Sequence, residues 1–551
     1  MKRTMTRAAW IALLLAAVAT MPVRAENEGL AELDEATALK VTAQTSDDLT
    51  AVIGKCRDAL DKGLDTDNEQ FARQLLASTL FQRGGLFAER VLAAPTFGRQ
   101  WQRVRELAIA DLERAISYDA QFGDAYYLIA RLHTLPGGDK ETGMAAADKA
   151  VQLAGDDQRS KARALIIRGG LRDDDEKRLA DFDEAVRADP DNQDARRIRG
   201  LYYLQKGENE KAAEDFAHLV EADDDSASAH AELAEALMEL GKHDEARQHI
   251  DQALELRPGY AVAYKLRAKV HLLEENLEAA IADLDDALHA NPRDLSTLLM
   301  RAHVKQMAGK VKEAKEDVDR ALALQPGLVQ AIAMRSLLSA ELDQFDEAIA
   351  DMEKLARADP ENVEWKLQIG SYQVAAKRPR KAVEIFTSVL ERDPENILAL
   401  RGRGDARLNY GKQAEAIADY EAVLKIQPEH SGVLNNLAWT LATSPDDKLR
   451  DGERAVKLAT TACEETEYKQ AHILSTLAAA YAEIGDFESA VQWATKAVEA
   501  APEEIKEQVA KELESYRQQK PWREVHDAED APEPGPFRGG ELKLPDGEEE
   551  E

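Results

Sequence analysis

The stretch AIADLDDALHANPRD, residues 280–294, decides the fold because the chain repeats it. AIADMEKLARADPEN follows at 348–362 and AIADYEAVLKIQPEH at 416–430, so each step is 68 residues. Prolines halve this step, at positions 258, 292, 326, 360, 394 and 428, and Pro190 precedes them by twice the interval. A fixed period of 34 residues is typical of stacked helix pairs. Each proline can end a helix, because it lacks the N–H that helix propagation needs.

Small and large residues recur at fixed places within the period, counted from the third residue after the proline. Position 20 is always alanine, at Ala212, Ala246, Ala280, Ala314, Ala348, Ala382 and Ala416. Position 24 carries larger side chains, at Phe216, Ile250, Leu284, Phe386 and Tyr420, and position 8 carries Gly200, Gly370 and Gly404. Small residues let two helices approach closely, so these positions are expected where the helices of a pair meet.

This combination of period and residue types resembles the tetratricopeptide repeat (TPR) family over most of the chain. The resemblance implies an all-α TPR solenoid, a right-handed superhelix of stacked antiparallel helix pairs. Nine repeats span 193–504, and the eighth carries the insertion SPDDKLRDGE. Residues 69–192 hold degenerate repeats, the first of them split at about 69–124 by an insertion rich in Gly, Phe and Arg.

The two ends of the chain have their own patterns. Residues 1–25, MKRTMTRAAWIALLLAAVATMPVRA, predict a signal peptide cleaved after Ala25, and a retained membrane anchor is the alternative. Residues 26–68 form an N-terminal helical segment in which 47–64 is expected to be an unpaired leading helix. At the other end we expect a capping helix at 505–520 and an acidic disordered tail at 521–551. The stretch from LNNLAWTLATSPDD to KPWRE resembles exported bacterial proteins of this repeat type, which implies a periplasmic or extracellular location.

The bulk composition excludes some classes of partner. The formal charge is −33, and without the first 25 residues 67 Lys and Arg face 104 Asp and Glu, a balance of −37. Such a surface repels phosphates, so no nucleic acid is expected as a partner. If the signal is cleaved, no integral membrane span is expected. Cys56 and Cys463 lie far apart in the sequence and are predicted to be two independent buried thiols.

An arginine and an aspartate occur together in some repeats and are both absent from others. Where position 7 is arginine, position 23 is aspartate, and where position 7 is apolar, as at Ile369, there is no aspartate at 23. The five pairs are Arg199 with Asp215, Arg267 with Asp283, Arg301 with Asp317, Arg335 with Asp351, and Arg403 with Asp419. We interpret them as structural ion pairs between the two helices of a repeat, bidentate because guanidinium matches carboxylate geometry. The interpretation of the arginines as ligand contacts is the alternative.

No pattern in the chain indicates catalysis or a cofactor. HExxH, GxSxG and GxxxxGK[ST] do not occur, and the eleven histidines form no metal-ligand spacing. His243 and His249 lie six residues apart, which does not place them on one helical face. The sequence therefore predicts a protein that is not an enzyme, with no cofactor and no metal.

The TPR resemblance implies a concave face lined by the first helices, with positions 2, 5, 9 and 12 in contact with a partner. Carried over, these positions give Arg197, Leu201, Lys265, Lys269, Leu272, His303, Gln306, Arg401, Asp405 and Trp439. The alternative is that they are ordinary exposed helix residues. The carboxylate clamp of some family members is incomplete here, because Lys269 and Met300 replace the two asparagines that should follow Lys265. Arg401, Asp405 and Asn436 form a second partial match.

These features predict a non-catalytic scaffold of the bacterial cell envelope that binds partner peptides or domains in the concave groove. The alternative is an accessory subunit that organises cell-wall or polysaccharide machinery and binds the polymer directly. The identity of the partner is not encoded in any of these patterns.

Overall fold

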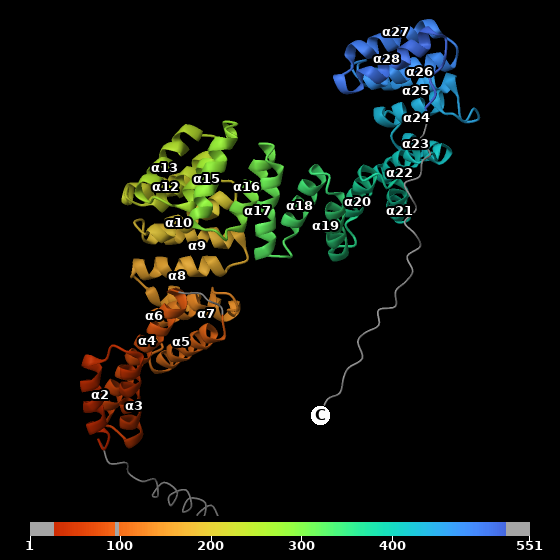
Figure 1. The fold of residues 1–551 in the computed structure, drawn as a ribbon. Helices are drawn as coiled ribbons and strands as arrows, with labels where there is room; N and C mark the ends of the chain where they lie inside the picture. Colours follow the sequence, from red (N-terminus) through yellow and green to blue (C-terminus); the bar gives the residue numbers. More distant parts are fainter. Residues whose placement is uncertain (1–26, 94–97, 525–551) are drawn as a thin grey trace, which may run out of the picture. The chain divides into compact units, whose positions relative to one another are not determined.

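The computed structural model describes residues 27–93 and 98–524, and within these ranges it is built of helices without strands (Figure 1). It divides into two compact units, Met1–Val270 and His271–Glu551, called here the N-terminal body and the C-terminal body. The boundary falls inside helix α14 (Ala261–Leu273). The predicted signal peptide lies outside the described residues. This architecture confirms the all-α TPR solenoid fold expected from the sequence.

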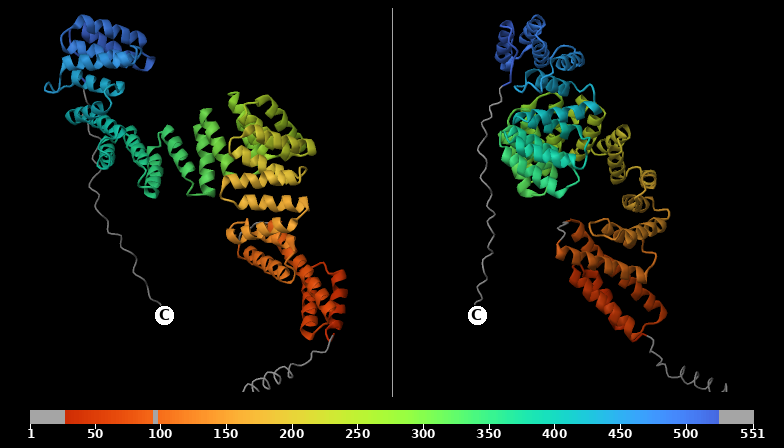
Figure 2. Two further views of the ribbon diagram at one scale, coloured as in Figure 1. Left: turned by 180° about the vertical axis from the view of Figure 1, so that it is seen from behind. Right: turned by 90° about the vertical axis from the view of Figure 1, so that its right-hand side faces the viewer.

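Each repeat contributes two helices that pack against each other, as the succession of paired helices in Figure 2 shows. The N-terminal body contains α2 (Leu30–Thr42), α3 (Ser46–Lys62), α4 (Thr66–Ala93), α5 (Arg99–Tyr118), α6 (Gly123–His133), α7 (Lys140–Ala154), α8 (Gln158–Leu171), α9 (Asp175–Ala188), α10 (Gln193–Gln205), α11 (Asn209–Ala222), α12 (Ala227–Glu239) and α13 (His243–Leu256). The first residues of α14 follow.

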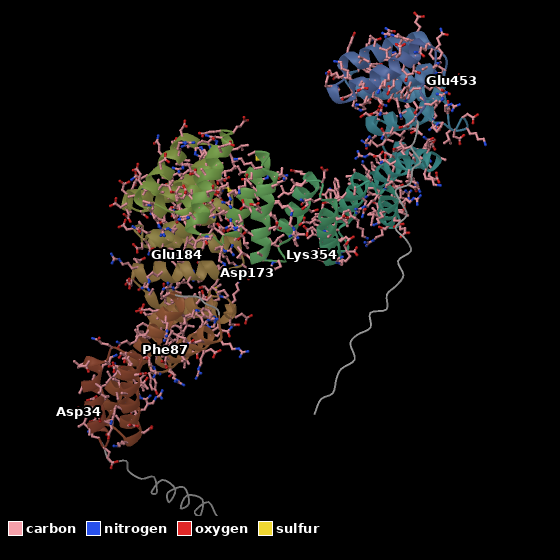
Figure 3. All side chains as sticks on the ribbon, viewed as in Figure 1. Asp34, Phe87, Asp173, Glu184, Lys354 and Glu453 are labelled. Carbon is pink, nitrogen blue, oxygen red and sulfur yellow. The ribbon has the colours of Figure 1, made fainter. Side chains whose placement is uncertain are left out.

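The C-terminal body continues the series after the end of α14. It contains α15 (Leu277–Ala290), α16 (Leu295–Met307), α17 (Val311–Leu324), α18 (Val329–Glu341), α19 (Phe345–Ala358), α20 (Val363–Ala375), α21 (Pro379–Leu390), α22 (Ile397–Asn409), α23 (Gln413–Ile426), α24 (Ser431–Thr443), α25 (Gly452–Glu465), α26 (Ala471–Glu483), α27 (Phe487–Ala500) and α28 (Glu503–Arg517). Charged side chains cover the outside of both bodies (Figure 3), where Asp34, Asp173, Lys354 and Glu453 are exposed.

Local sequence explains where the helices begin and end. Asn192 and Asn396 precede first helices, and the side chain of each accepts a hydrogen bond from the backbone N–H three residues on, at 3.0 Å. The turn between the two helices of a repeat needs a left-handed residue at position 15. In the repeat 397–430 this residue is Gly411, with φ of 80°. In the repeat 363–396 it is Lys377, which adopts the left-handed conformation at φ 57° although it carries a Cβ.

The expected close contacts between helices occur inside the repeats. All seven alanines at position 20 are fully buried. Gly370 on α20 lies so close to Phe386 on α21 that an added Cβ would stand 2.6 Å from the ring. Gly404 has the same relation to Tyr420, at 2.7 Å. The large residue at position 24 therefore occupies the space that the glycine at position 8 leaves open.

The prediction of an unpaired leading helix was wrong, because α3 packs against α2. Leu49 and Ile53 of α3 and Ala36 of α2 belong to one buried cluster, and Lys55 forms an ion pair with Glu35 at 2.6 Å. Residues 30–42 are only weakly amphipathic, so little in the sequence indicated this partner helix. The chain thus begins its described part with a complete helix pair.

The insertion in the first degenerate repeat lengthens both of its helices. α4 has 28 residues and α5 has 20, against 13 or 14 in most later helices. Trp101 near the start of α5 is buried, and its indole N–H donates to the carbonyl of Val91 on α4 at 3.0 Å. The inserted residues thus pair with each other along the extended hairpin.

At the other end, α28 packs on α27 and buries Leu513 and Tyr516. The acidic tail was expected from residue 521, but Pro521–Glu524 form defined contacts with earlier helices. Residues 525–551, the rest of that predicted tail, lie outside the described residues. Cys56 and Cys463 are free and buried, and burial raises their pKa to about 11 and about 12, so both thiols stay protonated at neutral pH.

Candidate partner-binding face

The structure brings four of the five sequence-predicted ion pairs together. In Arg335, Nε and Nη2 each donate to a different oxygen of Asp351, at 2.7 Å. Arg199 binds Asp215 in the same way at 2.8 and 2.7 Å, Arg301 binds Asp317, and Arg403 binds Asp419. These hydrogen bonds to the carboxylates raise the pKa of Arg199 and Arg335. The arginines therefore join the two helices of a repeat instead of facing a ligand.

Each of these arginines also reaches the preceding repeat, which the sequence analysis missed. Nη1 of Arg335 donates to Asp319 at 3.0 Å, sixteen residues earlier, while Asp351 lies sixteen residues later. Asp319 is at position 25 of its repeat. In other repeats the residue at this position accepts the corresponding hydrogen bond from the position-7 arginine that follows it, at Asp183, Asp251, Asp285 and Thr387. The recurrence of aspartate at position 25 was visible in the sequence. One guanidinium thus connects three helices.

The fifth pair remains a prediction, because Arg267 lies in the N-terminal body and Asp283 in the C-terminal body. Within its own body, Arg267 donates to Asp251 at 3.3 Å. Asp283 is buried, and its carboxylate lies 3.6 Å from Nε2 of His271.

Several predicted groove residues already have partners within the protein. Nε of Arg197 donates to the carboxylate of Glu232 on α12 at 3.0 Å. Burial raises the pKa of Glu232 above its ordinary value, although the hydrogen bond from Arg197 opposes this shift. Asp405 accepts from the Tyr420 hydroxyl at 2.6 Å and from the Asn436 amide at 3.1 Å. Gln306 bonds to Glu341, and Lys265 also has a polar partner. These side chains hold helices in register, which limits their role as ligand contacts.

The other predicted groove residues are open to solvent. Leu201, Lys269, His303 and Arg401 are exposed, and the structure gives the last three no hydrogen bond or ion pair within the described residues. Leu272 is half-buried. The exposed cations on the first helices are therefore fewer than the sequence predicted.

Large hydrophobic side chains are also exposed on the first helices. Between residues 193 and 504 the first helices expose Leu201, Val262, Leu273, Met307, Val329, Leu337 and Leu398. In the same described span, the second helices expose only Ile426. Leu201 and Leu337 occupy position 9 of their repeats, and Val262 and Leu398 occupy position 2, both positions at which the family resemblance implies contact with a partner.

Trp439, the tryptophan expected in the groove, is contacted by residues that follow the last helix. Its indole N–H donates to the Glu524 carboxylate at 3.0 Å, and the Glu524 backbone N–H donates to the Thr443 carbonyl at 3.0 Å. Arg523 forms an ion pair with Glu483 on α26 at 2.6 Å. Residues 521–524 therefore cover part of the first-helix face formed by α24 and α26, a contact that no local pattern indicated.

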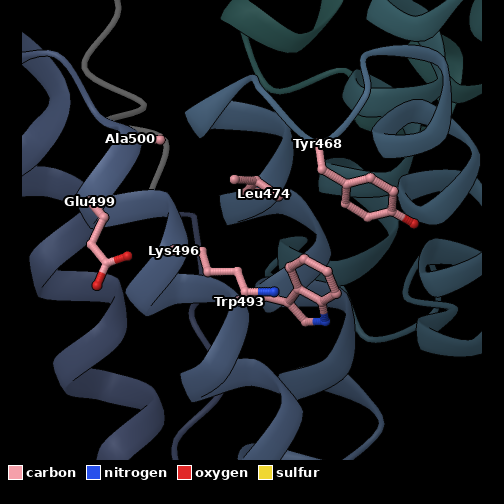
Figure 4. Close-up of a pocket in the computed structure, with 6 residues that line it drawn as sticks. All are labelled: Tyr468, Leu474, Trp493, Lys496, Glu499 and Ala500. Atoms are coloured by element: carbon pink, nitrogen blue, oxygen red, sulfur yellow. The ribbon is translucent and has the colours of Figure 1, made fainter.

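A separate pocket of about 550 Å³ lies beside α26 and α27 (Figure 4). Tyr468 stacks on Trp493 with ring centroids 5.4 Å apart, and Nζ of Lys496 lies 4.1 Å from the Trp493 ring centroid. Trp493 occupies position 23, the place of the aspartate in other repeats. The two rings and the ammonium group already contact one another, so the pocket offers a half-covered aromatic surface.

In the repeat 227–260, position 23 is His249 instead of aspartate. It contacts His230 on the first helix, a pairing that the sequence did not reveal. Nδ1 of His230 on α12 lies 2.9 Å from Nδ1 of His249 on α13, and Nε2 of His230 donates to the Asp224 carbonyl at 3.0 Å. Burial, and then His230, lower the pKa of His249. The spacing of 19 residues reveals this contact only once the helix pairing is known.

Residues 27–93 and 98–524 contain no group of three or more His, Cys, Asp or Glu placed to hold a metal ion. Within the same described part of the chain, no helix is both long and apolar enough to cross a bilayer.

Comparison with protein families gives a consistent result for several repeats. Three models described as "Tetratricopeptide repeat" match residues 203–270, residues 367–431, and residues 329–362 together with 471–504. These segments fall among the repeats that the proline period defines.

Solved TPR structures are similar to parts of the chain. YrrB, described as a TPR protein with an unusual peptide-binding site, is 23% identical over 34% of this chain and 97% of its own, with a TM-score of 0.31. A TPR protein from Parabacteroides merdae is 17% identical over 52% and 97%, with a TM-score of 0.35. Pseudomonas aeruginosa pilF is 19% identical over 42% and 99%, with a TM-score of 0.31. Comparison with curated proteins finds no match.

The 34-residue period, the helix pair built by each repeat and the matching family models lead to one conclusion: the chain belongs to the tetratricopeptide repeat family.

Proposed function

We propose that this chain is an exported, non-catalytic scaffold of the bacterial cell envelope that captures partner peptides or domains on its first-helix face. As a TPR protein it is a protein–protein interaction scaffold in general. The export and the envelope location rest on residues 1–25, whose charged start and apolar run are those of a signal peptide.

The observation that carries the proposal is the distribution of exposed apolar side chains. Leu337 on α18 is 46% exposed and Leu398 on α22 is 56% exposed, and both occupy groove positions of their repeats. The position-7 arginines form ion pairs within the protein. The first helices therefore offer a partner mainly apolar side chains. A partner segment with apolar side chains gains most by covering such a strip.

The test uses two variants that place new negative charge on different helices of the repeats. Leu337→Glu combined with Leu398→Glu changes the first-helix face, and Ile426→Glu changes an exposed position on a second helix. The full chain without its predicted signal peptide is cross-linked in envelope extract, and the attached proteins are identified by mass spectrometry. We expect the double variant to lose proteins that the parent and Ile426→Glu retain. If all three retain the same proteins, the first-helix face is not the binding surface.

The alternative function, direct polymer binding, predicts a result that a second assay with the purified protein measures. The parent protein would co-sediment with insoluble cell-wall polymer in the absence of other proteins. Trp439 would be the natural stacking surface for a sugar, but its indole N–H is bonded to Glu524. We therefore favour protein partners.

A further inference from the structure

Arg105 on α5 is a buried arginine without a carboxylate partner. Only 7% of its surface is exposed, and no carboxylate of the described residues lies within ion-pair distance. Nη1 lies 3.4 Å from the Pro136 carbonyl, and the guanidinium carbon lies 5.9 Å from the Trp101 ring centroid. Arg301, the other buried arginine of the described residues, is bound by two carboxylates. Residues 94–97, Ala-Pro-Thr-Phe, contain no acidic residue that could serve Arg105.

Two buried N–H groups at this place lack acceptors. Nε of Arg105 is buried and has no hydrogen-bond partner, and the same holds for Nε2 of His133 at the end of α6. Nδ1 of His133 accepts a hydrogen bond from the Asp139 backbone N–H at 2.9 Å. In a neutral imidazole the proton then resides on Nε2, which makes that atom a donor. A buried donor without an acceptor is costly, so two of them together, beside an uncompensated charge, require an explanation.

Both side chains adjoin the glycine loop between α6 and α7. A Cβ added to Gly138 would stand 2.7 Å from Nη2 of Arg105 and 2.8 Å from the carbonyl carbon of His133. Gly137 is exposed, and its Cβ would stand 4.0 Å from Nη1 of Arg105. The carboxylate of Asp139 is nearby but accepts from the Thr142 backbone N–H at 2.7 Å. Glu106 and Glu113 act only at longer range, without an ion pair.

We propose that Arg105 and His133 form a binding site for an oxyanion, either a phosphate group or a carboxylate, which enters beside the exposed Gly137. A planar guanidinium binds two oxygens of such a group, and the imidazole N–H binds a further lone pair. The anion supplies the acceptors that both buried donors lack, and it neutralises the arginine. This site lies in the degenerate repeats before residue 193, outside the nine repeats that carry the named groove residues, so the two proposals stand or fall separately.

The chain offers a matched pair of variants at Gly137, whose φ is 73°. Asn and Asp tolerate this left-handed conformation better than other side chains with a Cβ, so Gly137→Asn and Gly137→Asp share the same strain. Only the aspartate places a carboxylate within reach of Arg105. It therefore supplies the missing counter-charge from within the protein and competes with a bound anion.

The measurement is isothermal titration calorimetry on the chain without its predicted signal peptide, in chloride buffer. One series uses inorganic phosphate as the ligand and another uses acetate. We expect the parent and Gly137→Asn to bind one anion, and Gly137→Asp to bind it at least about tenfold more weakly, the loss typical of one charge-assisted contact. Binding of phosphate alone assigns the site to a phosphate group, binding of acetate alone assigns it to a carboxylate, and binding of both shows that it accepts either oxyanion. If neither anion binds the parent, or if the two variants bind equally, the site does not exist.

Discussion

Arg335 on α18 donates two hydrogen bonds to Asp351 on α19, each 2.7 Å long. The carboxylate is almost fully buried, whereas the guanidinium is a quarter exposed at the edge of the helix pair. Burial of an unpaired charge is costly, so neither residue can be removed alone without loss of stability. The repeat 363–396 reaches the same fold without the pair, because Ile369 and Ile385 stand at the two positions.

The first prediction concerns removal of one member of this pair. Asp351→Ala leaves Arg335 with two partly exposed carboxylates, Asp319 and, at 3.9 Å, Glu347, so the free energy of unfolding should fall by about 2–4 kcal/mol. Urea unfolding followed by circular dichroism measures this change. The control is Arg335→Ile combined with Asp351→Ile, which copies the neighbouring repeat and should stay within about 1 kcal/mol of the parent. If Asp351→Ala unfolds like the parent, the pair contributes no stability.

The second prediction concerns pH and the contact between His230 and His249. Since Nε2 of His230 donates to the Asp224 carbonyl, its Nδ1 accepts from His249, and a proton on that Nδ1 would bring two N–H groups face to face at 2.9 Å. Burial and the neighbouring imidazole lower the pKa of His249 below the ordinary 6.5, although the charges of Glu245 and Asp224 oppose this shift.

The folded repeat therefore binds fewer protons than the unfolded chain. The stabilising effect is present above pH 6.5 and is lost as the pH falls below that value, by at most about 1.4 kcal/mol for each pH unit and each excluded proton. Hydrogen exchange of α12 and α13 between pH 7.5 and 5.5, corrected for the intrinsic rates, measures it. His230→Leu combined with His249→Leu should remove the dependence. An unchanged dependence in this double variant would assign it to other groups.

The third prediction compares two helical glycines. Gly370→Ala adds a Cβ at 2.6 Å from the Phe386 ring and should lower the free energy of unfolding by about 1–3 kcal/mol through overpacking. Gly54→Ala on α3 meets nothing within 4 Å and should raise it by up to about 1 kcal/mol, since alanine favours a helix over glycine. Thermal unfolding measures the melting temperature of each variant, which should fall for Gly370→Ala and rise for Gly54→Ala relative to the parent. Stabilisation by Gly370→Ala would mean that the helices of this repeat do not meet at that residue.

Much of the fold could be predicted because the repeats are independent copies of one pattern. Proline, alanine and glycine at fixed positions report the ends and the close contacts of each helix pair. The coupled appearance of Arg335 with Asp351, and of apolar residues at Ile369 and Ile385, reports a contact between two helices without any structure. The groove stays a prediction, and the sequence did not show that Arg197, Asp405 and Trp439 already have hydrogen-bond partners within the protein.

The sequence by itself determined the period, the helix pairs and the residues that join them, because these contacts are local and recur at constant separations along the chain. Tertiary structure decided the contacts that occur once. α2 packs on α3, Glu524 reaches Trp439 across 85 residues, His230 lies against His249, and Arg105 is buried beside His133. A single contact leaves no repeated signal in one sequence. Whether a charged side chain is paired, exposed or left without an acceptor depends on the packing around it.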